Sequence, residues 1–278
     1  MTGKFQRNRL ITDLMACFAM NALALPALAH DPVFGLGPHV LFKGGVEIAP
    51  QVHISKAGEK EQAELDLELT YGLTGDWAAG VEIPYIARAP TDNASQANNG
   101  QGDLSLFSKY RFWREDGPGV QQSMSLAFKL KTDTGEREVS TGTTDAILGL
   151  SYGYEGRKWY RWAALRYRAN GKNADGLQRG DKVLLDLAGG IRMKKTGYRE
   201  PDTVWILELN TESAQANRLD GASVNNSGGS ALFVSPGIFW TQRNFAIKAG
   251  VQIALLDSLT GNQPASDYRA KLVLEWHL

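Results

Sequence analysis

Cysteine and long apolar runs are both scarce in this sequence of 278 residues. Cys17 is the only cysteine, so an intrachain disulfide framework is excluded. Beyond the first 30 residues, no uncharged apolar run approaches the roughly 20 residues that a membrane-spanning helix needs. Net charge is also absent, because 30 Lys and Arg residues balance 30 Asp and Glu residues, which gives no reason to expect a nucleic-acid partner. The chain beyond that point is therefore either soluble or crosses a membrane as strands.

The first residues have the three parts of a secretory signal peptide. Lys4, Arg7 and Arg9 form a basic start, an apolar stretch follows over 10–25, and small residues end the segment at Ala29. We therefore predict a signal peptide over 1–29, cleaved near Ala29. A short helix of a soluble protein is the alternative. Since Cys17 lies in this segment, the predicted mature chain contains no cysteine.

From residue 45 onward the sequence repeats one unit, about ten residues of alternating apolar and polar side chains followed by turn residues. Leu65, Leu67 and Leu69 alternate with Asp66 and Glu68, for example. A strand places such sets on opposite faces. Twelve segments follow this pattern: 45–56, 61–72, 77–88, 103–114, 121–132, 144–155, 159–170, 182–194, 203–216, 229–241, 245–256 and 267–278.

The connections between these segments alternate in length. Tight turns such as 73–76 and 115–119 lie on one side, and longer loops rich in Asn, Gly, Asp and Thr, such as 89–102 and 133–143, lie on the other. Outer-membrane barrels have short periplasmic turns and long external loops. We therefore predict an all-β fold, a transmembrane antiparallel up-and-down barrel of about 12 strands over 45–278. A soluble periplasmic β-sandwich or barrel that binds a ligand is the alternative.

Aromatic residues gather near the short-turn ends, as expected for the band of amphipathic rings at a membrane–water interface. Tyr160 and Phe239 are among them. The tryptophans expected in this girdle are Trp77, Trp113, Trp159, Trp162, Trp205, Trp240 and Trp276.

If the apolar set faces lipid, the opposite set lines the lumen. Charged residues buried in this way must pair or stay hydrated. Because twelve strands lie between a filled barrel and an open pore, we expect a narrow polar lumen partly crossed by ion pairs, which either fills the interior or forms a selective path. The predicted lining residues are Glu64, Asp66, Glu68, Glu82, Lys109, Arg111, Lys129, Lys131, Asp186, Arg192, Glu208, Glu212, Lys248, Arg269, Lys271 and Glu275.

Residues 30–44 precede the first strand and are apolar, punctuated by Gly and Pro, and without a clear period. They form either a plug that enters the lumen from the periplasmic side or a lead-in of the kind common at chain termini.

Catalytic and metal-binding patterns are weak. His53 and Ser55 lie two apart on one predicted strand, and therefore on one face. A His-x-Ser pair of this kind is similar to that of outer-membrane phospholipase A, but the neighbouring strand offers no Asn to orient the histidine, and the pair is on the polar face. Cleavage after Ala29 would create a new N-terminal amine beside His30 and Asp31, which could bind Cu²⁺ or Zn²⁺. The spacing of the histidines, however, matches no known metal-ligand pattern. We predict no catalytic residues, no metal and no cofactor.

Three pieces carry a family resemblance: Gly102-Asp103-Leu104-Ser105-Leu106, Lys109-Tyr110-Arg111-Phe112 and Ser235-Pro236-Gly237. Together with the order of a signal peptide followed by a barrel, these pieces resemble the outer-membrane proteins grouped as the putative MetA-pathway of phenol degradation family. The resemblance implies a barrel that passes small hydrophobic or aromatic compounds. Relatives with a start similar to His30-Asp31-Pro32-Val33-Phe34-Gly35 resemble proteins found beside metal-efflux systems, which leaves open an accessory role in metal efflux. The C-terminal strand resembles the signal read by the barrel-assembly machinery, although it ends in Leu278 where an aromatic residue is usual.

The predicted function is a non-enzymatic outer-membrane channel or transporter for small molecules, with outer-membrane lipid, a small solute and the assembly machinery as partners. The alternatives are a lipid hydrolase using His53 and Ser55, a barrel accessory to metal efflux, and the soluble ligand-binding protein.

Overall fold

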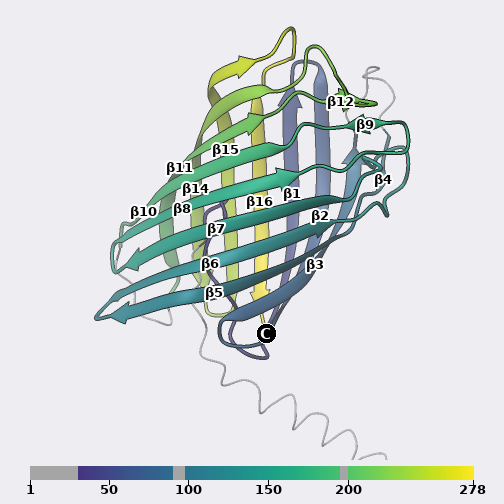
Figure 1. Ribbon diagram of the computed structural model, residues 1–278. Helices are drawn as coiled ribbons and strands as arrows, with labels where there is room; N and C mark the ends of the chain where they lie inside the picture. Colours follow the sequence, from purple (N-terminus) through teal and green to yellow (C-terminus); the bar gives the residue numbers. More distant parts are fainter. Residues whose placement is uncertain (1–30, 90–97, 195–199) are drawn as a thin grey trace, which may run out of the picture.

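The computed structural model describes residues 31–89, 98–194 and 200–278. The predicted signal peptide over 1–29 and His30 lie outside the described residues. None of the described residues forms a helix long and apolar enough to cross a membrane. The described part of the chain is instead built from strands (Figure 1).

Twelve long strands form one closed antiparallel sheet, because each pairs with the next along the chain and the last returns to the first. This arrangement is the predicted up-and-down barrel, and every predicted segment overlaps one of the strands. Their bounds are β1 (Val46–Ala57), β2 (Lys60–Gly72), β3 (Trp77–Arg88), β5 (Ser105–Gly117), β6 (Val120–Lys131), β7 (Asp145–Gly156), β8 (Trp159–Ala169), β10 (Lys182–Arg192), β11 (Asp202–Ala214), β14 (Gly229–Gln242), β15 (Phe245–Leu259) and β16 (Tyr268–His277).

Short strands occur only at the end of the barrel that carries the long loops, within the described residues. β4 (Gly100–Gln101) pairs with β3 at the barrel rim. β9 (Leu177–Gln178), β12 (Arg218–Leu219) and β13 (Ala222–Ser223) form a small separate sheet that joins two of the loops. At the opposite end, two-residue turns join β5 to β6, β7 to β8 and β14 to β15. The long-loop end therefore has structure of its own, and we call it the loop end.

The outer wall is apolar. Large hydrophobic side chains at alternate positions of the strands are exposed, including Leu65, Leu106, Leu148, Leu165 and Leu207. A wall of this kind suits a hydrocarbon environment and is unlike the polar surface of a soluble barrel. The fold is that of a transmembrane outer-membrane barrel.

The tryptophans divide between the two faces. Trp77, Trp159, Trp205 and Trp276 are exposed on the outer wall near the short turns. Trp113 and Trp240 are partly exposed, and Trp240 lies edge-on to Phe245 at 6.2 Å between ring centroids.

Three aromatic residues expected in the girdle lie inside the barrel. Trp162 is 3% exposed and stacks on Tyr160 with 5.7 Å between ring centroids, in an interior cluster that also contains Phe239, Val204 and Ile206. The expectation for these three residues was wrong. Because side chains alternate across a strand, Trp159 and Trp162 cannot face the same side. Closeness to the turn predicts the position of an aromatic ring along the barrel axis, but not whether the ring faces the lipid or the lumen.

The apolar wall makes a direct prediction for Leu148, which is 58% exposed on β7. A charged residue facing hydrocarbon costs about 2–4 kcal/mol at the bilayer midplane of a transmembrane barrel and about 1 kcal/mol or less near the interfaces. Because Leu148 lies toward the loop end of β7, we expect Leu148→Arg to lower the free energy of unfolding by about 1–2 kcal/mol in lipid vesicles, measured by urea titration with the gel shift of the unboiled barrel. Leu219→Arg is the matched control, because Leu219 is 48% exposed on β12 in a loop. Equal stability of the two variants would contradict a membrane-facing wall.

Candidate functional site

The predicted lumen residues lie at inward positions of the wall, and most have a partner of opposite charge. Lys248 lies 2.5 Å from Glu275, and Arg166 lies 2.7 Å from Asp186. Other ion pairs join Lys129 to Glu82, Lys131 to Asp103, Lys109 to Asp31, Arg111 to Asp76, Arg192 to Asp202 and Arg269 to Glu212. Glu68 accepts a hydrogen bond from Gln51, and Glu64 accepts one from Gln62. Asp66 lies 3.3 Å from the His53 Nε2 atom, and Lys271 lines two cavities.

Some of these pairs reach over intervening strands. Arg269 on β16 bonds to Glu212 on β11, although β15 and β14 lie between those strands in the sheet. The Arg269 guanidinium also lies 4.5 Å from the ring centroid of Phe233. Contacts of this reach narrow the lumen. This pair also gives the charges of Arg269 and Glu212 partners of opposite sign, which a low-dielectric interior requires.

Residues 31–43 enter the barrel, with only Lys43 at their end exposed, and we call them the plug segment (Figure 1, darkest purple). The Glu208 carboxylate is fully buried and accepts hydrogen bonds from the backbone N–H groups of Val33 at 2.6 Å, Phe34 at 3.2 Å and Gly35 at 2.9 Å. Asn210 donates to the same carboxylate at 3.4 Å. Hydrogen bonds to a charged acceptor are stronger than those between neutral groups. Glu208 is therefore the main polar anchor of the plug segment.

The wall is hollowed where the plug segment lies. A Cβ atom on Gly149 would lie 2.6 Å from the Leu36 side chain, and one on Gly153 would lie 2.7 Å from Pro38. A Cβ atom on Gly237 would lie 3.0 Å from the Val33 side chain, and one on Gly250 would lie 3.0 Å from Phe34. Ser125 bonds the carbonyl of Pro38 at 2.5 Å, and Val33, Val40 and Leu41 are buried. The glycines leave space that the plug segment fills.

Three cavities lie in series along the lumen. The first, of about 330 Å³, adjoins the plug segment and shares Phe34, Arg166 and Lys271 with a middle cavity of about 370 Å³. The middle cavity shares Ser55, Gln62, Glu212 and Arg269 with a third, of about 490 Å³, at the loop end. We call these the inner, middle and outer cavities. Their shared linings trace one polar route from the loop end to the plug segment.

His53 and Ser55 both line the middle cavity, so they face the lumen and not the lipid. The His53 Nε2 atom lies 3.3 Å from Asp66 and 3.2 Å from Gln51. His53 and Ser55 are not joined by a hydrogen bond in the part of the chain that the structure describes. A nucleophile needs its base within hydrogen-bond reach, so this arrangement gives Ser55 no activating partner.

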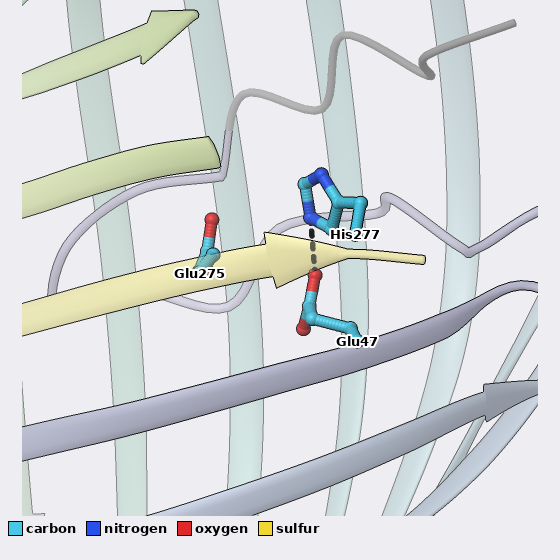
Figure 2. Close-up of side chains that lie close together, drawn as sticks. All are labelled: Glu47, Glu275 and His277. Carbon is cyan, nitrogen blue, oxygen red and sulfur yellow. Dashed lines mark hydrogen bonds and ion pairs between the residues drawn. The ribbon is translucent and has the colours of Figure 1, made fainter. Parts of the chain in front are cut away.

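Glu47, Glu275 and His277 form a close group at the seam between β1 and β16, with ligand atoms within 4.8 Å of one another (Figure 2). The His277 ring lies 2.7 Å from the Glu47 carboxylate, and the Lys248 ammonium lies 2.5 Å from Glu275. Each of the three side chains thus has a protein partner, and a lysine supplies positive charge beside them. The arrangement acts as an ion-pair network that joins the first strand to the last.

At the loop end, Asp103 holds the loop 132–144 against the rim. Its carboxylate accepts from Lys131 at 2.7 Å, Ser140 at 2.6 Å and the Gly135 N–H at 3.0 Å. Burial alone would raise the pKa of Asp103, but these bonds outweigh it and lower the pKa from 3.8 to about 2. The ionised carboxylate is therefore the form that holds this loop.

Sequence reasoning placed Glu208 in the lumen but did not identify its bonds to the plug segment, which join residues more than 170 positions apart. The pairing of Asp31 with Lys109 was missed for the same reason. One signal was available, because Gly149 and Gly153 occupy inward positions of a strand in which larger side chains would otherwise fill the lumen. Such gaps indicate that another part of the chain approaches closely.

Comparisons with known proteins agree with this fold. A family model described as "Putative MetA-pathway of phenol degradation" matches residues 63–258. An outer membrane channel from Pseudomonas putida F1 is similar in structure with a TM-score of 0.66 and 15% identity, covering 90% of this chain and 100% of that one. The NanC porin is similar with a TM-score of 0.53 and 10% identity, covering 83% and 100%. No curated protein matches the chain in sequence.

The depressed pKa of Asp103 predicts a loop that opens in acid. The pKa of Asp103 in the folded protein lies below its ordinary value of 3.8, so the ionised carboxylate stabilises the closed loop fully above about pH 4. This stabilisation is lost as the pH falls through about 2. A spin label at Arg137→Cys should report an immobile loop at neutral pH and a mobile one near pH 2.

The same bonds predict the effect of Asp103→Asn at neutral pH. Losing the charge should cost about 2 kcal/mol and raise the open fraction of the loop about thirtyfold, measured as faster tryptic cleavage after Arg137. Asp133→Asn is the control in the same loop, because Asp133 is exposed and makes no hydrogen bond or ion pair with the described residues. Equal cleavage of the two variants would show that Asp103 does not hold the loop.

Proposed function

This chain belongs to the family described as "Putative MetA-pathway of phenol degradation", and from that membership and the interior of the barrel we propose that it is an outer-membrane channel for small solutes. The observation that carries the proposal is the polar route of three neighbouring cavities with shared lining residues. A barrel interior that served only to fill space would need no such series of cavities. The proposal assigns no catalytic step to the protein.

The plug segment is the proposed gate. It closes the inner end of the route, and its polar contacts with the wall are few: Glu208 with three N–H groups, Ser125 with Pro38, Lys109 with Asp31, and Arg166 with the Phe34 carbonyl at 3.5 Å. No backbone ladder joins residues 31–43 to the wall among the described residues. Withdrawal of the segment therefore leaves the pairing of the barrel strands unchanged.

The lining of the inner cavity favours amphipathic solutes. Phe34 and Phe107 line it beside charged side chains such as Lys109 and Glu82. A solute with one apolar face and one polar group could contact both kinds of surface. This supports small aromatic compounds that carry a polar substituent as candidate solutes.

Glu208→Gln tests both the channel and the gate. The glutamine amide keeps the size of the side chain but removes the charge that three N–H groups share, so each of these bonds weakens. We expect the plug segment to detach more often and the open probability in planar bilayers to rise about tenfold or more, the factor that corresponds to roughly 1.4 kcal/mol. The unboiled barrel should keep its gel shift, which shows that it is folded.

Glu64→Gln is the matched control, because Glu64 faces the lumen and bonds to Gln62 but not to the plug segment. It should conduct like the unaltered protein. Folded barrels that pass no ions in any of the three proteins would overturn the channel. A conducting protein in which Glu208→Gln and Glu64→Gln behave alike would retain the channel but exclude Glu208 as the anchor of the gate.

A further inference from the structure

The charges along the route are unevenly distributed. Counting Asp, Glu, Lys and Arg, the inner cavity is lined by five acidic and five basic side chains, and the middle cavity by three of each. The outer cavity is lined by only two acidic side chains, Glu212 and Asp257. The same cavity is lined by six basic side chains: Lys56, Lys60, Arg168, Arg179, Lys182 and Arg269. The excess of positive charge is thus confined to the loop end.

Neighbouring carboxylates neutralise only part of this charge. Arg168 lies 2.6 Å from Asp145, which also lies 3.7 Å from Lys131. Glu212 forms ion pairs with two basic side chains: Arg269, and Lys182 at 3.8 Å. Lys56 lies 3.9 Å from Glu61, which is also 2.7 Å from Arg88. Asp145, Glu212 and Glu61 are therefore each shared between two basic groups.

Arg179 forms no hydrogen bond or ion pair with any of the described residues, and its side chain is exposed. The backbone beside it is nevertheless fixed. The Gly180 carbonyl accepts from Asn170 at 2.7 Å, and the Gly180 N–H donates to Asn217 at 2.9 Å. Gln178 on the other side donates to the Asn170 carbonyl at 2.9 Å. The loop thus holds an exposed guanidinium without a direct ion pair at the rim of the outer cavity.

A narrow mouth that carries net charge of one sign raises the local concentration of ions of the other sign. Arginine offers several N–H donors in a planar fork that matches the two oxygens of a carboxylate. We propose that the outer cavity is an anion-collecting site and that the channel takes small organic solutes carrying a carboxylate. This inference rests on the proposed channel function and adds the class of its solute.

Ion selectivity tests the inference in conducting pores. In a KCl gradient across a planar bilayer, the reversal potential should show preference for chloride in the unaltered protein. The double variant Arg179→Gln, Lys182→Gln should lose most of that preference. Lys172→Gln is the matched control, because Lys172 is paired with Asp220 at 3.3 Å on the exposed side of the same loop and does not line the cavity. It should keep the selectivity of the unaltered protein.

Ligand binding tests the same site without requiring conduction. Benzoate and benzyl alcohol share the aromatic ring and differ in the carboxylate. Calorimetry on the detergent-solubilised barrel should show benzoate binding that weakens about fivefold in the double variant, as expected for the loss of two exposed charge-assisted contacts. Benzyl alcohol should bind equally weakly to both proteins.

The outcomes separate the two proposals. Pores that conduct but prefer potassium or neither ion would overturn the anion-collecting site and leave the channel intact. Equal affinity for benzoate and benzyl alcohol would do the same. Preferential benzoate binding by a barrel that never conducts would support the site and overturn the channel.

Discussion

Closure of the sheet is the constraint on which the rest of this structure depends. In hydrocarbon an unpaired backbone N–H or C=O costs several kcal/mol, so a spanning sheet cannot keep a free edge. Here the edge disappears because β1 pairs with β16 over eight positions, from Glu47 opposite His277 to Lys56 opposite Tyr268. The side chains of Glu47 and His277 then bond across the same seam (Figure 2). The first and last strands are therefore joined by both backbone and side-chain contacts.

Closure also determines where charge can lie. Once the outer face is apolar, alternation directs the remaining side chains into the lumen, where each charge must find a partner. The deeper lumen meets this condition with equal numbers of acidic and basic residues, and the fully buried Glu208 meets it with three N–H groups of the plug segment. At the loop end, water solvates the charged side chains, so they do not all need a partner of opposite charge. An excess of basic residues therefore costs little stability at the loop end, whereas the same excess deep in the lumen would be strongly destabilising.

The strands were predictable from the sequence because each carries its own evidence, namely a period of two and turn residues at its ends. Orientation was predictable only where that alternation was followed strictly. Trp162 was misplaced because its distance from the turn was weighed above its position relative to Trp159. The partners of the lumen residues were beyond reach, since alternation gives the face of a side chain and not its neighbour across the lumen. For the same reason the sequence left open whether 30–44 is a plug or a lead-in.

The way the plug segment is held separates gating from stability. A segment paired into the wall could move only by breaking the ladder that makes the barrel stable in a membrane. Residues 31–43 instead use side-chain anchors, while the chain near Gly44 and Gly45 is tied to the end of β2 through Gly72. That tie fixes one end of the segment and leaves the part bound by Glu208 dependent on a few local bonds. Weakening the Glu208 anchor therefore alters how often the route opens, whereas the unfolding of the barrel is governed by the twelve paired strands.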